Sequence, residues 1–306
     1  ITFHARPELH GFTGESEVYE VCETDGSTLG AVILDPFTRN TKRGGAWMTS
    51  IVDQADLTKA LPVVTNTCNF PRPTEGSPSL LSWDNVITMF HEFGHALHGL
   101  LSKVRYPSRA GTAVPRDFVE FPSQVNELWA WDETLISRFA VHHETGAPLP
   151  AALAERLRAS RSVGEGHHTL ELVAAMLLDQ AWHSTTLEEL PASVDELEGF
   201  EAAALQRAGV AHELVPPRYR SCYFSHIFGG GYAAAYYGYL WAEVMDADAC
   251  AWFKDNGGLN REAGEHFRRE LLRHGGSIEP MESWRGFRGA EPDVSHLLRR
   301  KGLANA

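Results

Sequence analysis

Residues 90–101 have the sequence FHEFGHALHGLL, which contains His91-Glu92-Phe93-Gly94-His95. If this stretch is helical, His91 and His95 lie one turn apart on one face, so their imidazoles can bind the same metal ion. Glu92 then lies at the rim of that face, where its carboxylate can take a proton from a water molecule. The spacing is typical of zinc-dependent peptidases, with the glutamate as general base.

The flanking residues predict that the motif lies on an ordered helix over Trp83–Leu101. Ser82 or Asp84 can cap its start. Apolar residues recur at three- and four-residue spacing and predict a buried stripe: Phe90, Phe93, Leu97, Leu100 and Leu101. Gly94 costs about 1 kcal/mol of helix stability relative to alanine, so we expect that another backbone or the substrate comes close there. The alternative is a surface helix that carries two histidines by chance.

A catalytic zinc ion has three protein ligands, so the two histidines need one further His, Asp or Glu. We predict Glu120, which follows His95 by 25 residues and begins the next helix after a loop long enough to fold back. Glu127 or Glu133 would be the ligand if the helix register differs. Asp117 is expected either to cap that helix or to support a ligand histidine.

The other histidines are interpreted as structural or exposed. His98 lies on the same stripe as His91 but roughly 10 Å along the helix axis from it, too far to share a metal ion. It therefore fits a structural or supporting role better than ligation. The remaining histidines of the middle of the chain are expected to have no role at the metal: His167, His168, His183 and His212.

The pattern of apolar and polar residues on both sides of the motif predicts the remaining strands and helices. Before it we expect strands at residues 18–22, 29–35 and 63–70, the first two forming a hairpin. The two glycines in residues 39–50 suggest a close backbone approach or a bulge, with an edge loop as the alternative. After the motif we expect helices at these ranges: 118–143, 151–160, 170–184, 194–207, 232–253 and 260–274.

A second constellation comprises His226, Tyr232, Tyr236 and Tyr239. In a helix over residues 232–253 the three tyrosines share one face. Amide hydrolysis builds negative charge on the carbonyl oxygen, and a phenol or imidazole donor aimed at it can lower the barrier by about 3 kcal/mol. Taken alone, an aromatic stripe that packs in the core is the simpler interpretation.

The length, composition and net charge limit the number of domains and the kinds of partner. The 306-residue chain is 43% hydrophobic and 22% charged, enough for one large domain or two modest ones. We interpret residues 1–306 as one catalytic region, with a β-rich leading segment at 1–80 and a helical zinc- and substrate-binding part at 81–306. The formal net charge of -13 argues against nucleic acid or an anionic membrane as a partner.

Cysteine usage favours a reducing compartment. The four cysteines are Cys22, Cys68, Cys222 and Cys250. They are far apart in sequence, so neither a disulfide framework nor a thiolate zinc site is indicated. No signal peptide opens the chain, and its longest aromatic-rich run, residues 229–245, is too short to span a membrane and carries Glu243. We expect a soluble, cytoplasmic protein.

Four segments together resemble the thimet oligopeptidase family of zinc metallopeptidases. They are TKRGGAWM from Thr41, FHEFGHALHGL from Phe90, GTAVPRDFVEFPSQVNE from Gly111 and FSHIFGGGYAAAYYGYLWAEV from Phe224. RDFVEFPSQ and SHIFGGGY look most like the bacterial peptidyl-dipeptidase, or dipeptidyl carboxypeptidase, branch. The resemblance implies a mainly α, zincin-like catalytic domain with a small β-sheet. It also implies that His91, His95 and Glu120 bind one zinc ion and that Glu92 is the general base and proton shuttle.

For the second constellation, the resemblance implies that His226, Tyr232 and Tyr239 contact the scissile carbonyl or the peptide backbone and stabilise the tetrahedral intermediate. Tyr236 belongs to the same motif and is expected to contribute to substrate binding. The implied reaction is zinc-dependent hydrolysis of short peptides with release of C-terminal dipeptides. The alternatives are an oligopeptidase that cleaves internally and a catalytically weak peptide-binding fragment.

The chain is less than half as long as is usual in this family, whose N-terminal half forms the other wall of a deep substrate channel. Three interpretations remain open: a fragment, a natural short form, or one piece of a nicked enzyme. The implied partners are short peptide substrates, and a missing N-terminal half or second chain that completes the channel.

Overall fold

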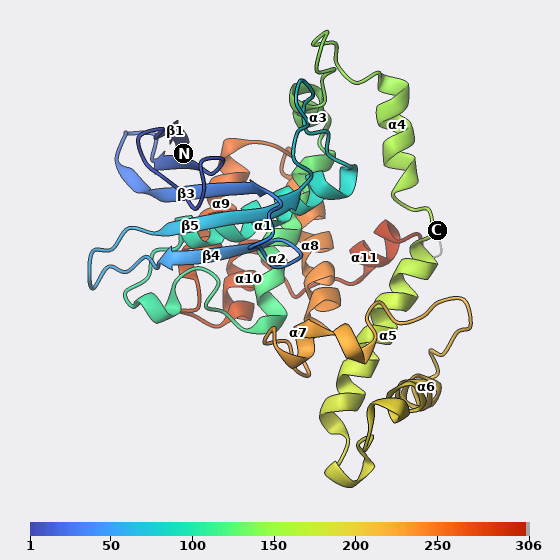
Figure 1. The fold of residues 1–306 in the computed structure, drawn as a ribbon. Coiled ribbons are helices and arrows are strands. Elements are labelled where there is room, and N and C mark those ends of the chain that lie inside the picture. Colours follow the sequence, from blue (N-terminus) through green and yellow to red (C-terminus); the bar gives the residue numbers. More distant parts are fainter. Residues whose placement is uncertain (304–306) are drawn as a thin grey trace. The chain divides into compact units, whose positions relative to one another are not determined.

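A five-stranded mixed sheet forms the first part of the chain in the computed structural model, which describes residues 1–303 (Figure 1). Its strand order is β1-β2-β3-β5-β4. The strands are β1 Thr2–Ala5, β2 Glu17–Cys22, β3 Thr28–Phe37, β4 Trp47–Val52 and β5 Val63–Phe70. β3 and β5 are parallel and the other neighbours are antiparallel. The three predicted strands and the hairpin are confirmed.

Helices make up most of the remainder. In the described residues they are α1 Trp83–Leu101, α2 Arg116–Glu127, α3 Glu133–Phe139, α4 Ala151–Ser160, α5 Glu165–Ser184, α6 Leu197–Arg207, α7 Ser225–Phe228, α8 Gly238–Asp255, α9 Arg261–Glu270, α10 Pro280–Arg288 and α11 Ser295–Arg300. The predicted class, mainly α with a small β-sheet, is confirmed.

The chain divides into two compact units. Unit 1 comprises Ile1–Ala151 and Ala242–Leu297 and contains the whole sheet together with α1 and α2. Unit 2 comprises Ala152–Trp241 and the residues from Leu298 on, and contains α5, α6 and α7. Helix α8 contributes residues to both units.

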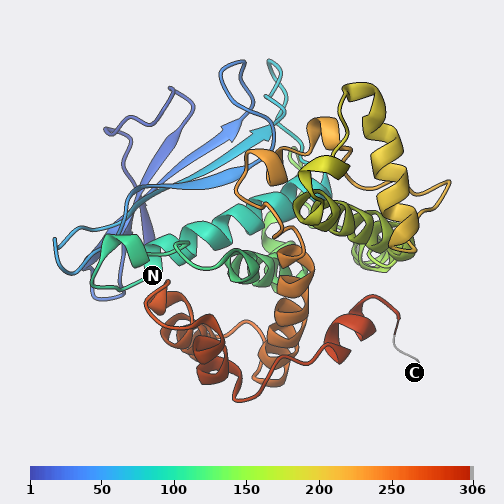
Figure 2. The ribbon, with the colours of Figure 1, turned by 90° about the horizontal axis from the view of Figure 1, so that it is seen from below.

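In unit 1, α1 packs along one face of the sheet, where it contacts β3, β4 and β5 (Figure 2). Side chains from the sheet and from α1, α2, α8, α9 and α10 form one hydrophobic core. Its most buried members include Val21, Val32, Val64, Leu100, Phe121, Met245 and Trp284. The helix that carries the histidine motif is therefore held between the sheet and other helices, which gives its polar residues a rigid support.

The loop before β4 is anchored by a buried lysine. The Lys42 side chain is only 2% exposed and forms an ion pair with Asp35. Its Nζ donates hydrogen bonds to the carbonyl oxygens of Asp35, Phe37 and Cys68, each at 2.7 Å. A Cβ at Gly45 would meet no atom within 4 Å, and its φ of +87° explains the glycine instead. The predicted close approach at the two glycines is thus wrong. Both glycines lie in a loop, as the alternative expected, but residues 47–50 of the same stretch belong to the edge strand β4, which was not predicted.

Gly94 lets α1 and α2 approach closely, as expected from its place in the motif. A Cβ at Gly94 would lie 2.6 Å from the Cα of Ser123 and 2.9 Å from the Cβ of Asn126, both on α2. Close beside this contact, the Asn126 side-chain amide donates a hydrogen bond of 2.6 Å to the carbonyl oxygen of Phe90. The close approach at Gly94 sets the distance between α1 and α2, the two helices that carry the candidate ligands.

We predict that Gly94→Ala destabilises the protein by about 1–3 kcal/mol, because the added methyl group must displace the α2 backbone. Gly264→Ala is the matched control, since Gly264 lies in α9 and a Cβ there meets no atom within 4 Å. The control should gain about 0.4–1 kcal/mol from the reduced freedom of the unfolded chain. Urea unfolding of both variants tests this prediction, which a Gly94→Ala protein as stable as the parent would contradict.

Two predicted helices differ from the structure near the candidate site residues. Smaller differences occur elsewhere: α5 begins at Glu165 rather than 170, and α9 ends at Glu270 rather than 274. The helix expected over 118–143 ends at Glu127, and after a 3-10 turn the Asp132 side chain accepts the amide of Leu135 and caps a separate helix, α3. The helix expected from residue 232 begins instead at Gly238, so Tyr232 and Tyr236 lie in the preceding turns. The expectation that the tyrosines share one helical face is therefore wrong.

Candidate metal centre and active site

The two motif histidines lie together on α1. Ser82 is the N-cap residue, and it forms a capping box in which its side chain accepts the Asn85 amide and the Asn85 side chain accepts the Ser82 amide. The helix brings the ring centroids of His91 and His95 to 4.9 Å from each other, with the rings nearly perpendicular. Both Nε2 atoms face α2.

Glu120 of α2 lies against both histidines. Its Oε2 is 3.2 Å from the Nε2 of His91 and 3.2 Å from the Nε2 of His95. One ligand atom from each of the three residues lies within 4.8 Å of the others, and Glu120 itself is 3% exposed. The structure thus brings together the three residues that the sequence predicts as ligands. Two imidazoles and one carboxylate are a donor set that fits zinc.

The side chains of this group shift one another's pKa. Burial alone would raise the pKa of Glu120, but hydrogen bonds from His91 and His95 outweigh it and hold that pKa well below the usual range. Burial would likewise lower the pKa of His91, yet its contacts with Glu120 and Glu127 raise that pKa well above the usual value. A buried carboxylate surrounded by imidazoles stabilises positive charge at the point where the three side chains meet.

Glu127 contacts the outer nitrogen of a candidate ligand. Its Oε1 lies 2.7 Å from the Nδ1 of His91, on the opposite side of the ring from Glu120. A carboxylate in that position accepts the Nδ1 proton, so Nε2 is left as the metal-binding atom. Glu127 therefore contacts His91 from outside the group that Glu120 completes. Glu133, the other alternative, begins α3 and is not among the grouped ligand atoms.

Glu92 is placed to act as a base beside this group. It is 8% exposed, and burial raises the pKa of its carboxyl, although the neighbouring His91 and His95 oppose the shift. The backbone N–H of Met48 in β4 donates a hydrogen bond to this carboxylate. A carboxylate with a raised pKa can accept a proton at neutral pH and release it again. The contact with Met48 had no signal in the sequence, because a backbone donor is independent of residue type.

The other histidines lie apart from this group. His98 is buried, and burial followed by the charge of His95 lowers its pKa to about 3. It is therefore a neutral core residue, in line with the structural role expected. His167 and His168 lie near Glu171 on α5 but are both exposed. The His183 Nδ1 lies 2.8 Å from the buried carboxylate of Asp179.

The second constellation forms an aromatic cluster within unit 2. The rings of Tyr232 and Tyr239 stack at 5.3 Å between centroids, and the His226 ring lies 6.2 Å and 6.3 Å from them. The Tyr232 amide donates a hydrogen bond of 3.0 Å to the His226 carbonyl oxygen. Tyr236 differs because it is only 3% exposed and its ring packs edge-on against Phe224. Tyr236 thus has the packing role that the sequence left open.

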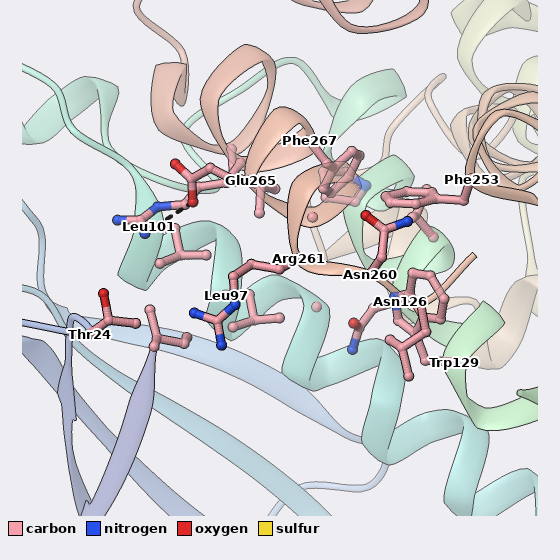
Figure 3. A pocket seen from close by; sticks show the side chains of 18 of the residues that line it. Thr24, Leu97, Leu101, Asn126, Trp129, Phe253, Asn260, Arg261, Glu265 and Phe267 are labelled. Carbon is pink, nitrogen blue, oxygen red and sulfur yellow. Dashed lines mark ion pairs between the residues drawn. The ribbon is translucent and has the colours of Figure 1, made fainter. Parts of the chain in front are cut away.

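A cavity of about 630 Å³ opens in unit 1 beside α1 (Figure 3). Its wall includes Leu97 and Leu101 of α1, with Trp129, Phe253 and Phe267 from other elements. None of the candidate ligands lines it, and neither does Glu92. The cavity therefore does not include the grouped donor atoms, which make the candidate site instead.

Comparisons with known proteins show that the chain is similar to peptidases. Residues 1–303 match Peptidase family M3. The chain is 45% identical over 303 residues to dipeptidyl carboxypeptidase of Salmonella typhimurium, covering 99% of this chain and 44% of that protein. It is 38% identical over 307 residues to oligopeptidase A of the same bacterium, covering 99% and 45%. The chain thus spans less than half the length of these relatives.

Among solved structures, metallocarboxypeptidase 1 of Trypanosoma cruzi has a similar fold, with a TM-score of 0.53 at 16% identity over 78% of this chain and 53% of that one. At this identity the likeness concerns the fold alone. None of the helices in residues 1–303 is both long enough and apolar enough to cross a membrane.

Proposed function

Since the chain belongs to peptidase family M3, we propose that it hydrolyses peptide bonds in short peptides with one zinc ion held by His91, His95 and Glu120. One observation carries the proposal: both histidine Nε2 atoms lie 3.2 Å from a single buried oxygen of Glu120, next to the buried carboxylate of Glu92. Zinc bound there would polarise the scissile carbonyl group and lower the pKa of water.

In this proposal the protein moves the protons through Glu92. Its carboxylate takes a proton from the attacking water and passes it to the nitrogen of the leaving amine. The hydrogen bond from the Met48 backbone N–H orients the carboxylate. Glu127 keeps the proton of His91 on Nδ1, which leaves Nε2 free to bind the ion.

The edge of the sheet offers a place for the peptide. β4 is the last strand in the order β1-β2-β3-β5-β4, and within the described residues it pairs only with β5. An extended peptide can add to such an edge through main-chain hydrogen bonds, which suit substrates of varied sequence. Because Met48 of β4 contacts Glu92, a peptide on this edge would lie beside the proposed base.

We assign His226, Tyr232 and Tyr239 to the carbonyl oxygen and backbone of the bound peptide. Their supporting observation is the cluster in unit 2, where two partly exposed phenols and an imidazole lie close together. Hydrogen-bond donors of this kind stabilise the negative charge that develops on the carbonyl oxygen. The Tyr236 ring packs beside them, with its centroid 5.5 Å from that of His226 and 5.0 Å from that of Tyr239.

Release of C-terminal dipeptides is the favoured form of the reaction, because the 45% identical relative is a dipeptidyl carboxypeptidase. Internal cleavage is the second candidate, and the 38% identical oligopeptidase A supports it. A catalytically weak peptide-binding fragment is the third, because the chain spans 44% of the first relative. In that case a further segment or second chain would complete the channel.

A cytoplasmic location is also proposed, in line with four free thiols.

The test is product analysis by mass spectrometry after incubation of the zinc-loaded 306-residue chain with a nonapeptide, as the free acid and as the C-terminal amide. We expect successive losses of C-terminal dipeptides from the acid and little cleavage of the amide. Equal cleavage of both peptides at internal bonds would favour the oligopeptidase. No cleavage by a chain that contains one zinc ion would favour the peptide-binding fragment.

A further inference from the structure

A buried carboxylate in unit 2 accepts two backbone amides of the tyrosine segment, residues 229–239. Asp179 lies on α5 and is 0% exposed. Its Oδ1 accepts the amide of Ala234 and its Oδ2 accepts the amide of Tyr236, both at 2.9 Å. Burying a carboxylate is costly unless it is paired, and hydrogen bonds to a charged acceptor are among the stronger ones. This pair of contacts therefore ties the tyrosine segment firmly to α5.

The backbone at the point of attachment is strained. Ala234 has a φ of +53°, in the left-handed region that is unfavourable for a residue with a Cβ. Its carbonyl oxygen accepts a hydrogen bond of 3.0 Å from the side chain of Gln180, the residue after Asp179. Both polar backbone groups of Ala234 are thus held by neighbouring residues of α5. Strained residues held by such contacts often lie at functional sites.

His183 completes the attachment one turn further along α5. Its Nδ1 lies 2.8 Å from Oδ1 of Asp179 and 2.9 Å from the Asp179 carbonyl oxygen. Two acceptors around one ring nitrogen place the proton on Nδ1, so His183 donates to Asp179. The Ala234 amide is 3.3 Å from the same nitrogen and donates to Oδ1 instead. His183 therefore orients the carboxylate toward the tyrosine segment.

The attachment lies between the two phenols that we assign to the substrate. Tyr232 precedes Ala234 by two residues, and Tyr239 follows Tyr236 by three. Their rings stack at an interplanar angle of 20°. The turn at Ala234 and Tyr236 sets the path of the chain between them, so its conformation determines how the two rings meet. Asp179 is the residue that holds this turn from outside the segment.

We propose that Asp179 is a positioning residue for the hydrolysis: it fixes the turn between Tyr232 and Tyr239 and thereby aligns both phenols. The inference rests on the proposed function, since the phenols are assigned there to the substrate. Without the carboxylate, the strained φ of Ala234 is no longer held, and the turn samples other conformations. Chemistry that needs a donor aimed at the carbonyl oxygen then slows, while the zinc ligands on α1 and α2 are untouched.

The main test variant is Asp179→Asn, which keeps the shape of the side chain but presents an NH₂ group to a backbone N–H. We expect kcat to fall by about 10- to 100-fold, below the full loss of one oxyanion donor. KM should change by less than about 3-fold and zinc content should stay at one ion. Hydrogen–deuterium exchange should become faster at the amides of residues 232–239, which measures release of the turn directly.

A second variant, Gln180→Ala, tests the same attachment in case Asp179→Asn does not fold. Gln180 is exposed, so Gln180→Ala should fold normally while it removes the bond to the Ala234 carbonyl oxygen. We expect kcat to fall and exchange at residues 232–239 to become faster, each by less than in Asp179→Asn. Asp248→Asn is the matched control, because Asp248 is also 0% exposed and accepts a backbone N–H, that of Asp293, away from the tyrosine segment. It should leave exchange at residues 232–239 unchanged.

Normal kcat in folded Asp179→Asn and Gln180→Ala proteins would overturn the inference, as would unchanged exchange at residues 232–239. An equal fall in kcat in Asp248→Asn would mean that the effect is general destabilisation. If the parent chain hydrolyses no peptide, the proposed function fails by that result alone. The exchange measurement then decides whether Asp179 fixes the turn.

Discussion

Glu92→Gln is expected to abolish detectable peptide hydrolysis while the chain still binds one zinc ion. Glutamine has nearly the same shape, but its amide cannot accept and release the proton of the attacking water. General acid–base catalysis contributes about 10²- to 10⁴-fold, so a fall of at least this size is expected. Glu92 is not one of the grouped ligand atoms, so metal content should be unaffected.

The measurement pairs turnover of a free-acid nonapeptide with metal analysis of the same sample. Asp84→Asn is the control, because Asp84 is an exposed carboxylate in the first turn of the same helix. It should leave both quantities at the parent level. Full turnover in the Glu92→Gln protein would exclude Glu92 as the base.

Glu120→Ala is expected to remove tight zinc binding, whereas Glu127→Gln is expected only to weaken it. The substitution deletes the buried oxygen that lies 3.2 Å from both histidine nitrogens, and two imidazoles alone do not make a three-ligand site. Glu127→Gln should weaken zinc binding by only about 10- to 100-fold, because it loosens the hold on His91 without removing a ligand.

Competition with a chelator of known affinity measures both variants in one experiment. The expected order of affinity is parent, Glu127→Gln, then Glu120→Ala. Circular dichroism of the metal-free proteins separates loss of binding from loss of folding. A Glu120→Ala protein with the parent's affinity would show that another residue is the third ligand, and a Glu127→Gln protein weaker than Glu120→Ala would reverse the two roles.

The residues of the candidate metal centre were predictable because the motif that carries the two histidines is local. Helical periodicity places His91 and His95 on one face whatever the rest of the fold, and the loop after α1 is long enough for Glu120 to fold back to them. The resemblance of four segments to the thimet oligopeptidase family agrees with the match to Peptidase family M3. The roles of Glu92, His226 and the tyrosines stay predictions.

Errors in the helix bounds have a common physical origin. The apolar pattern continues past Glu127, but a 3-10 turn and a cap at Asp132 start a new helix. The pattern also continues back from Gly238 to Tyr232, yet Asp179 and Gln180 hold Ala234 at a positive φ that no helix can include. In the second case the decisive contact joins residues 55 apart in sequence. Periodicity records which residues are apolar and carries no information about such a contact.

The sequence by itself determined the motif helix, the mainly α class with a small sheet, and the family. Each of these depends on spacing within one segment or on the order of segments. Only the tertiary structure decided that Glu127 contacts His91, that the Met48 backbone contacts Glu92, and that Asp179 accepts amides of the tyrosine segment. These three depend on hydrogen bonds between residues far apart in sequence, two of them through backbone groups that every residue type shares. Their geometry exists only once the chain has folded.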